Sequence, residues 1–250
     1  MARKRASHVQ SNRPTPKNGK LASRTRARRS SWLRTVLLIL FAAFGLYYTF
    51  IAGSLLLLRW VNPPFTAVQI ERRISAWADG TPYTKHYRFV PISSISVNLQ
   101  HAVIAAEDER FYQHHGFDWK QIQIAAAEDL EEHRERGAST ITQQLVRNLF
   151  LSTNRSLVRK ALEFSIVPLT EAILSKRRIL ELYLNVIEFG RGIFGAEAAS
   201  RIYYGISAQR LTRLQAAQLA SVLPSPLHRR PGQVPTYTRI ILAHMAQMNW

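Results

Sequence analysis

The sequence contains no cysteine. Disulfide bonds, thiolate metal ligands and cysteine nucleophiles are therefore excluded as explanations of what the chain does. Acidic residues are scarce as well: 16 Asp and Glu stand against 34 Lys and Arg, and the first of them is Glu71. The resulting net charge of +18 favours phosphates, nucleic acid or anionic lipid as partners, but it does not indicate a fold.

Apolar residues are nearly missing from the first 31 positions, which hold 10 Lys or Arg together with Pro14, Pro16 and many Ser. Such a segment cannot bury enough surface to offset the entropy of ordering. We therefore predict that residues 1–31 form a disordered basic tail.

Charge is missing from the next segment, residues 35–58, which are TVLLILFAAFGLYYTFIAGSLLLL. As a helix these residues would be about 36 Å long, against about 30 Å of hydrocarbon in a bilayer. The run is too long for a cleaved signal peptide, and it is apolar on all sides, unlike a core helix that carries one polar face. We predict a membrane span over 32–60, flanked by Trp32, Arg34, Arg59 and Trp60 as interfacial anchors. The positive-inside rule then puts the tail in the cytoplasm and residues 61–250 outside.

The remaining chain is predicted to be mainly α-helical, with one domain over 61–250. Residues 61–97 contain five Pro or Gly and are predicted to be extended, with strands at 87–90 and 93–97. Predicted helices cover 98–109, 119–133, 139–150, 156–174, 176–187, 192–204, 212–223 and 237–249. Asp118, Ser139, Ser156 and Ser175 are predicted N-caps, Thr212 with Gln215 is a predicted capping box, and Pro168 predicts a kink or break.

Two carboxylates, Glu107 and Asp108, directly follow the apolar run AVIAA. A carboxylate at the edge of an apolar environment has a raised pKa and can act as a general base. A solvated helix end with a charge cluster is the commoner explanation of this pattern. No third ligand stands at a suitable spacing from His114 and His115, so we predict hydrogen-bonding rather than metal-binding roles for them.

A second polar segment, GASTITQQLVR, begins at Gly137. The free N–H groups at a helix start can bind an anion. Ser139, Gln143 and Arg147 follow one face of the predicted helix, which suggests hydrogen bonding to a sugar or phosphate. A capped helix with a neutral polar face explains the pattern equally well.

Two further segments are rich in basic residues. Arg159 and Glu163 form an i, i+4 pair, and for this segment taken alone a surface ion pair is the preferred explanation. The functional alternative is a cationic cradle for a diphosphate, in which Arg147, Arg155 and Lys160 share the charge of the leaving group. The segment 176–185, KRRILELYLN, is predicted to be mostly core packing, with Asn185 as a capping or supporting residue.

Together the four segments resemble peptidoglycan glycosyltransferase family 51, the transglycosylase domain of penicillin-binding proteins. The family patterns are E-D-x-x-F-x-x-H-x-G, G-x-S-T-x-T-Q-Q, R-K-x-x-E and K-x-x-I-L-x-x-Y-L-N, and the sequence matches all of them in order. The resemblance runs from about residue 60 to 231 and is strongest to the monofunctional members, since no transpeptidase domain is expected before Trp250. It implies a mostly helical, lysozyme-like domain with two lobes.

The resemblance also implies roles for individual residues in joining lipid II units into β-1,4-linked glycan strands, with inversion and release of undecaprenyl diphosphate. Glu107 would be the general base, and Glu163 the second essential carboxylate. Asp108, Phe111 and Asn185 would be scaffold for the cleft. Substrate contact or cleft support is implied for Ser139, Gln143 and Gln144, and binding of the donor phosphates for Arg147, Arg155, Arg159 and Lys160. The segment His228-Arg229-Arg230 departs from the family pattern.

The partners implied are lipid II, the growing lipid-linked glycan, the bacterial cytoplasmic membrane and other cell-wall synthesis or division proteins, with no nucleic acid. No cofactor is expected; a divalent cation such as Mg or Mn is compatible with a diphosphate, but the sequence offers no dedicated metal site. Two rivals are a hydrolase, which would use the glutamate as an acid, and a non-catalytic anchor whose basic tail binds nucleic acid or anionic lipid. The cationic segments favour the transferase, because cleavage between two sugars needs no cations beside the glutamate.

Overall fold

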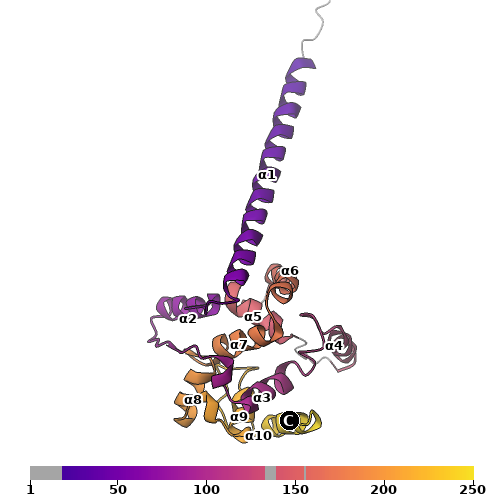
Figure 1. Ribbon diagram of the computed structural model, residues 1–250. Coiled ribbons are helices and arrows are strands. Elements are labelled where there is room, and N and C mark those ends of the chain that lie inside the picture. The colour runs from indigo at the N-terminus through magenta and orange to yellow at the C-terminus, as the bar shows by residue number, and fades with distance from the viewer. Residues whose placement is uncertain (1–18, 133–138, 155) are drawn as a thin grey trace, which may run out of the picture. The chain divides into compact units, whose positions relative to one another are not determined.

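The computed structural model describes residues 19–132, 139–154 and 156–250 (Figure 1). By its internal contacts the chain divides into two units, Met1–Phe50 and Ile51–Trp250. Ten α-helices, three short strands and two 3-10 turns are found in the described residues. The prediction of a mainly α-helical chain is therefore confirmed, while the lysozyme-like division into two lobes stays a prediction.

The first helix, α1 (Gly19–Leu57), contains the apolar segment. Residues 34–57 within it have a mean hydropathy of 2.1 and are long and apolar enough to cross a membrane, in agreement with the predicted span. The helix begins at Gly19, which corrects the prediction that disorder extends to residue 31; residues 1–18 lie outside the described residues. Ala, Leu, Lys and Arg are good helix formers, and lengthening an existing helix requires no new nucleus.

The prediction that residues 61–97 are extended is wrong, because this segment contains the helix α2 (Ala67–Ala78). Pro63 and Pro64 precede this helix rather than interrupt it, and the Thr66 side chain caps it by accepting from the Gln69 backbone N–H at 3.3 Å. Val68 and Ala76 form its buried face. The two prolines therefore mark the start of a helix. Counting the Pro and Gly residues of the whole segment does not distinguish such a helix start from a loop.

The predicted strand at 93–97 is also wrong. The structure has the short strand β1 (His86–Tyr87), then the 3-10 turn η1 (Ile92–Ser94), and then α3 (Val97–Glu107). Ser96 is the N-cap of α3 and accepts from the Asn98 N–H at 3.2 Å. A capping serine and a tight turn here interrupt what looks like an alternating strand pattern.

Four helices follow: α4 (Trp119–Glu132), α5 (Ile141–Phe150), α6 (Leu157–Ile173) and α7 (Lys176–Val186). Asp118, Ser156 and Ser175 accept hydrogen bonds at the starts of α4, α6 and α7, as predicted. The N-cap of α5 is Thr140 rather than Ser139. Helix α6 continues through Pro168, so the predicted break is absent from this described helix.

The three short strands form one small sheet in the order β1-β3-β2, with β3 (Ile193–Phe194) parallel to β1 and antiparallel to β2 (Glu188–Gly190). The predicted helix 192–204 therefore starts later, as α8 (Ala196–Tyr204). Gly195 has φ 84°, and a Cβ there would lie 2.3 Å from the Asn185 carbonyl oxygen. This close approach needs glycine and ends the strand where the helix begins.

The core domain is completed by η2 (Ala208–Arg210), α9 (Arg213–Ala220) and α10 (Pro235–Gln247). The predicted capping box of Thr212 and Gln215 opens α9. Helices α3, α9 and α10 pack together, and α5 packs between α6, α7 and α2. Hydrogen bonds from Gln144 to Glu107 and from Tyr183 to Gln144 join the end of α3 to α5 and α7, which are labelled near the centre of the domain in Figure 1.

Candidate active site

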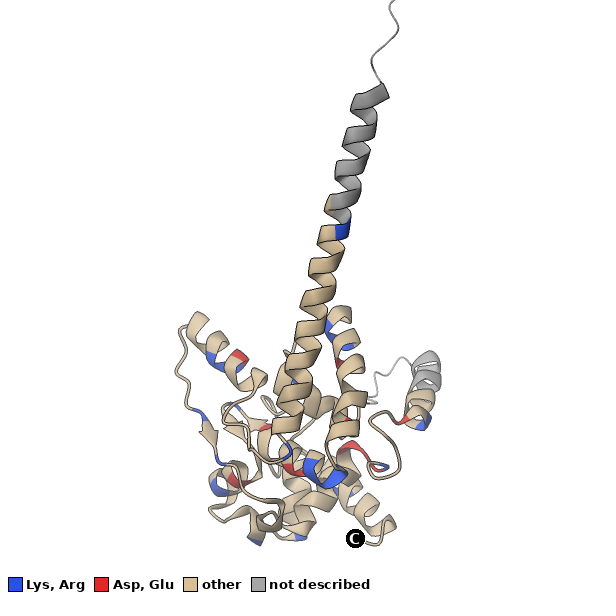
Figure 2. Cartoon of the chain, turned by 45° about the horizontal axis from the view of Figure 1, so that its top comes forward, with Lys and Arg blue, Asp and Glu red and all other residues tan. Residues whose placement is uncertain are grey.

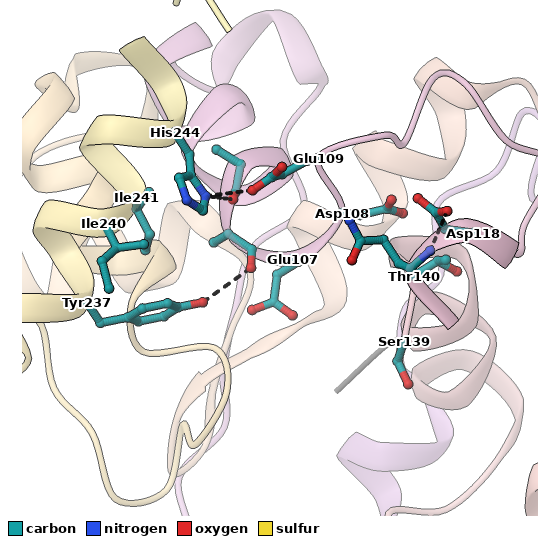
Figure 3. A pocket seen from close by; sticks show the side chains of 13 residues that line it. Glu107, Asp108, Glu109, Asp118, Ser139, Thr140, Tyr237, Ile240, Ile241 and His244 are labelled. Atoms are coloured by element: carbon teal, nitrogen blue, oxygen red, sulfur yellow. Dashed lines mark hydrogen bonds and ion pairs between the residues drawn. The ribbon is translucent and has the colours of Figure 1, made fainter. Parts of the chain in front are cut away.

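Glu107 is the last residue of α3 and lines a cavity of about 520 Å³ (Figure 3). Its Oε2 atom accepts a hydrogen bond from Gln144 Nε2 at 2.7 Å, whereas its enclosed Oε1 atom has no hydrogen-bond partner among the described residues. Burial raises the pKa of Glu107, and the Gln144 hydrogen bond and the Arg147 charge oppose this only in part. A carboxylate held in this way binds a proton more tightly than an exposed one, as a general base requires.

The orientation of Gln144 depends on Tyr183, a buried residue of α7. The Tyr183 phenol donates to Gln144 Oε1 at 2.8 Å, which leaves the amide nitrogen to face Glu107. An ionised carboxylate can only accept hydrogen bonds, so this orientation of the amide is the one that satisfies all three groups. Burial, followed by the Glu107 charge, raises the Tyr183 pKa well above 10.0, which keeps the phenol protonated as the donor. The sequence analysis assigned Tyr183 to core packing. A polar role could have been inferred from the rule that a buried tyrosine needs a hydrogen-bond partner for its hydroxyl.

Asp108 joins the end of α3 to the start of α5. Its Oδ2 atom accepts from the Ile141 backbone N–H at 3.0 Å, and its Oδ1 atom lies 2.8 Å from His114 Nε2. The Gly116 N–H donates to His114 Nδ1, so the proton of the neutral ring is on Nε2 and is donated to Asp108. A carboxylate at a helix N-terminus is stabilised by the free N–H groups there. Asp108 therefore links α3 to the start of α5 beside the cavity, while its role as scaffold for the cleft stays a prediction.

One group of potential metal ligands occurs among the described residues: Asp108, His114 and Asp118, whose ligand atoms all lie within 4.8 Å of one another. Both nitrogens of His114 and both oxygens of Asp108 are engaged in hydrogen bonds. Ligation through Nε2 would move the proton to Nδ1, which the Gly116 N–H already approaches at 3.2 Å. The tertiary structure thus brings two carboxylates beside His114, which corrects the expectation that no third ligand lies near it. Asp108 and His114 are held in hydrogen bonds, whereas Asp118 Oδ2 has no partner among the described residues.

The polar residues at the start of α5 have different surroundings from one another. Ser139 precedes the helix and lines the cavity with Glu107. Gln143 is 2% exposed, and its side chain accepts from the Thr140 N–H at 2.9 Å in a capping box. This favours cleft support over substrate contact for Gln143, while Ser139 remains open to a bound molecule.

Two arginines approach Glu107. Arg147 lies one turn beyond Gln143 on α5, makes no ion pair with a described carboxylate, and lowers the pKa of Glu107 by its charge. Arg229 has the same effect, lies over the Tyr237 ring, and donates to the Ser221 carbonyl at 3.3 Å. Sequence reasoning noted Arg229 only as a departure from the family pattern, because nothing local indicates that residue 229 returns to residue 107. Arg155 lies outside the described residues.

Glu163, on α6, is 1% exposed and is paired with two cations. Its carboxylate oxygens lie 2.5 Å from Arg159 Nη1 and 2.5 Å from Lys160 Nζ. The burial of Glu163 distinguishes this cluster from an ordinary surface ion pair, and its arrangement favours the predicted role of organising the cations. Among the described residues, no hydrogen bond or ion pair joins the cluster to Glu107.

The last two predicted scaffold residues are fully buried. Asn185 holds the loop before η1, since its amide accepts from the Val90 N–H at 2.8 Å and donates to the Val90 carbonyl at 2.9 Å. Phe111 is a core residue whose ring lies under the Lys176 ammonium at 4.5 Å. Both positions support a scaffold role through packing rather than through contact with Glu107.

Helix α10 supplies a wall of the cavity that sequence reasoning missed (Figure 3). Tyr237 donates to the Ala106 carbonyl at 3.2 Å, and His244 Nδ1 lies 2.6 Å from Glu109. Burial and the nearby Glu107 charge raise the pKa of Tyr237 to about 12. The sequence predicted this helix but contained no motif that placed it beside Glu107.

Comparison with known proteins agrees with these motifs and this geometry. The model of the family described as Transglycosylase matches residues 72–246. A biosynthetic peptidoglycan transglycosylase of Pseudomonas putida is 50% identical over 181 residues, which cover 71% of this chain and 77% of the relative. A relative of the same description from Pseudomonas aeruginosa is 45% identical over 80% of this chain and 88% of the relative. Another, from Laribacter hongkongensis, is 42% identical over 86% of this chain and 96% of the relative. The match over most of the domain, which includes all four motifs, shows that the chain belongs to the transglycosylase family.

Proposed function

We propose that the chain is a monofunctional peptidoglycan glycosyltransferase that polymerises lipid II into β-1,4-linked glycan strands. The observation that carries the proposal is Glu107, a carboxylate of raised pKa that lines a cavity of about 520 Å³ and is held by one amide donor. The family match and the description shared by the relatives support the same activity.

In the proposed reaction, Glu107 removes the proton from the 4-hydroxyl group of the acceptor sugar. The oxygen attacks C1 of the donor sugar, the new glycosidic bond forms, and the bond from C1 to the diphosphate breaks. The proton stays on Glu107, and the electron pair leaves with undecaprenyl diphosphate. A single displacement of this kind inverts the configuration at C1, since attack and departure occur on opposite faces.

The cations have distinct parts in this proposal. Arg147 and Arg229 both lower the pKa of Glu107 by their charge, and neither forms an ion pair with a carboxylate that the structure describes. Arg147, on α5, is the one of the two that we assign to the developing charge of the leaving group. Arg159 and Lys160 are held by Glu163 and would offer positioned N–H donors rather than two full charges. Ser139, at the cavity, is a candidate for a hydrogen bond to the substrate.

A glycoside hydrolase would also use a glutamate of raised pKa, but as a proton donor to a sugar–sugar bond. The pKa of Glu107 does not distinguish the two reactions. Unneutralised Arg147 favours transfer from a diphosphate, because a neutral sugar leaving group needs no cation.

The setting of this activity is proposed to be the bacterial cytoplasmic membrane. Residues 34–57 would cross it, with the basic N-terminus in the cytoplasm and the catalytic domain on the other side, as the positive-inside rule predicts. That side is where a lipid-linked precursor would be joined to a cell-wall strand.

The test is polymerisation of labelled lipid II by the full chain in detergent, with products separated by length. We expect polymer from the wild type, none from Glu107→Gln, and wild-type product from Asp79→Asn, which removes an exposed carboxylate outside the cavity. Cleavage of finished glycan by a wild type that makes no polymer would assign the chain to the hydrolases instead. Folding of each variant is checked by circular dichroism.

A further inference from the structure

A second cavity, of about 430 Å³, shares no lining residue with the cavity of Glu107. We call it the α2 pocket. It lies against α2 and the chain that follows, and the residues that matter here are Phe65, Gln69, Ile70, Arg73, Tyr83 and Lys85. None of them belongs to the four motifs, so the reaction proposed above leaves the pocket without a role.

Two polar groups of the α2 pocket are enclosed but unsatisfied. Gln69 is 2% exposed; its carbonyl oxygen accepts from Lys85 Nζ at 3.4 Å, and its Nε2 group has no partner among the described residues. The Tyr83 hydroxyl is likewise without a partner in the described part of the chain. Buried donors are nearly always hydrogen-bonded in native proteins, so these two indicate a missing acceptor.

The charge of the α2 pocket is positive. Arg73 and Lys85 form no ion pair with any carboxylate that the structure describes. Burial, followed by the charge of Glu188, raises the pKa of the Tyr83 phenol, and the Glu188 carboxylate is itself paired with Arg72 at 2.9 Å. The ribbon in Figure 2 is blue, for Lys and Arg, at positions on α2 and on the segment that follows it. An acceptor in this pocket should therefore be an anion.

One side of the α2 pocket is apolar and exposed. Phe65 and Ile70 are 58% and 44% exposed, and Ile74 and Trp77 continue the same face of α2 at helical spacing. The domain begins directly after the apolar segment, where the Arg178 side chain donates to the carbonyls of Leu58 and Val61. The pocket thus follows the end of the predicted span by only a few residues, and it combines cations with apolar surface as membrane-interface sites do.

We propose that the α2 pocket binds the phosphate headgroup of an anionic membrane phospholipid. The guanidinium of Arg73 and the ammonium of Lys85 contact the phosphate oxygens, the Gln69 amide and the Tyr83 hydroxyl donate to them, and the acyl chains follow Phe65 and Ile70. Free phosphate would satisfy the donors but leave the apolar side exposed to water, which is why the lipid is favoured. This site is separate from transglycosylation, and its test does not depend on it.

The test uses the full chain in detergent micelles and measures lipid retained by native mass spectrometry during titration with short-chain phosphatidylglycerol. We expect saturable binding of one lipid to the wild type, weakened about tenfold or more in Arg73→Gln/Lys85→Gln, since two charge-assisted hydrogen bonds are lost. The matched control is Lys120→Gln/Arg239→Gln, which removes the same charge from two exposed cations elsewhere and should leave the affinity unchanged. Gln69→Met, which keeps the side-chain volume, should weaken binding without any change in charge.

Three outcomes would overturn the proposal. Equal weakening in both double variants would mean that only net charge matters, and no specific pocket exists. Equal retention of phosphatidylcholine, which is zwitterionic, would remove the anionic headgroup as the recognised feature. Complete displacement of the lipid by inorganic phosphate at the same concentration would show that the apolar side contributes nothing.

Discussion

Replacement of Tyr183 by Phe tests whether the α7 core positions the proposed base. The change removes one oxygen and keeps the ring that fills the core, so the Gln144 carbonyl loses its donor at 2.8 Å. An unsatisfied buried acceptor costs about 1–3 kcal/mol, and an amide free to rotate also weakens its hydrogen bond to the Glu107 carboxylate, a bond of a kind that contributes about 1.5–3 kcal/mol. At 1.4 kcal/mol for each factor of ten, polymerisation should slow by about 10- to 100-fold.

The pH dependence separates this positioning role from a loss of stability. The Gln144 hydrogen bond lowers the pKa of Glu107, so its loss raises that pKa further. A general base acts when deprotonated, and the acidic limb of the rate profile in Tyr183→Phe should therefore move to higher pH. The assay is the initial rate of lipid II polymerisation across pH, at a temperature where the variant is folded.

A matched control is Tyr203→Phe, which removes a similar phenol donor from the Phe189 carbonyl at 3.0 Å. This variant should have a lower free energy of unfolding than the wild type, but its polymerisation rate should depend on pH in the same way. If the Tyr183→Phe profile superimposes on that of the wild type, the Tyr183–Gln144–Glu107 chain does not position the base and the reasoning is refuted.

Three further predictions concern single charges. Burial raises the pKa of Glu107 above 4.5, so the ionised carboxylate destabilises the fold at neutral pH; Glu107→Gln should raise the melting temperature at pH 7, and this gain should vanish below about pH 4.5. Glu163→Gln leaves two cations unpaired and should lower the free energy of unfolding by about 1–3 kcal/mol in urea titrations, less than for a fully buried pair because Lys160 is 38% exposed. Arg147→Gln should move the acidic limb to higher pH whereas Arg147→Lys should not; an identical shift in both would argue against a charge effect.

Local chemistry explains which elements the sequence predicted well. The caps at Ser156 and Ser175 and the capping box at Thr212 depend on residues within four positions of one another, and the apolar segment is one continuous run of residues. The errors occur where two local explanations compete. Helix α2 was missed because Pro63 and Pro64 mark a helix start as readily as a loop, and Ser139 and Thr140 are adjacent residues of similar capping strength.

In the candidate site, too, local motifs identified some features, whereas others depend on tertiary packing. Its motifs identified Glu107 and Glu163 as carboxylates of interest, but the burial of Glu163 to 1% exposure, which distinguishes it from a surface pair, depends on how α6 packs. The approach of Arg229 and the wall made by α10 involve residues more than 100 positions from Glu107. No period or spacing within the chain encodes such contacts.

What the sequence by itself determined is therefore the asymmetry of charge, the apolar helix, the helical class of the domain and the family to which its four motifs belong. The first three follow from residue type and short-range periodicity, which act before any tertiary contact forms, whereas the family follows from the resemblance that the four motifs carry. Only the tertiary structure decided that Tyr183 directs the Gln144 amide at Glu107, since these residues are separated by 39 and 37 positions and meet only when α3, α5 and α7 pack. The same packing withdraws one oxygen of Glu107 from water, and this desolvation gives the carboxylate its raised pKa.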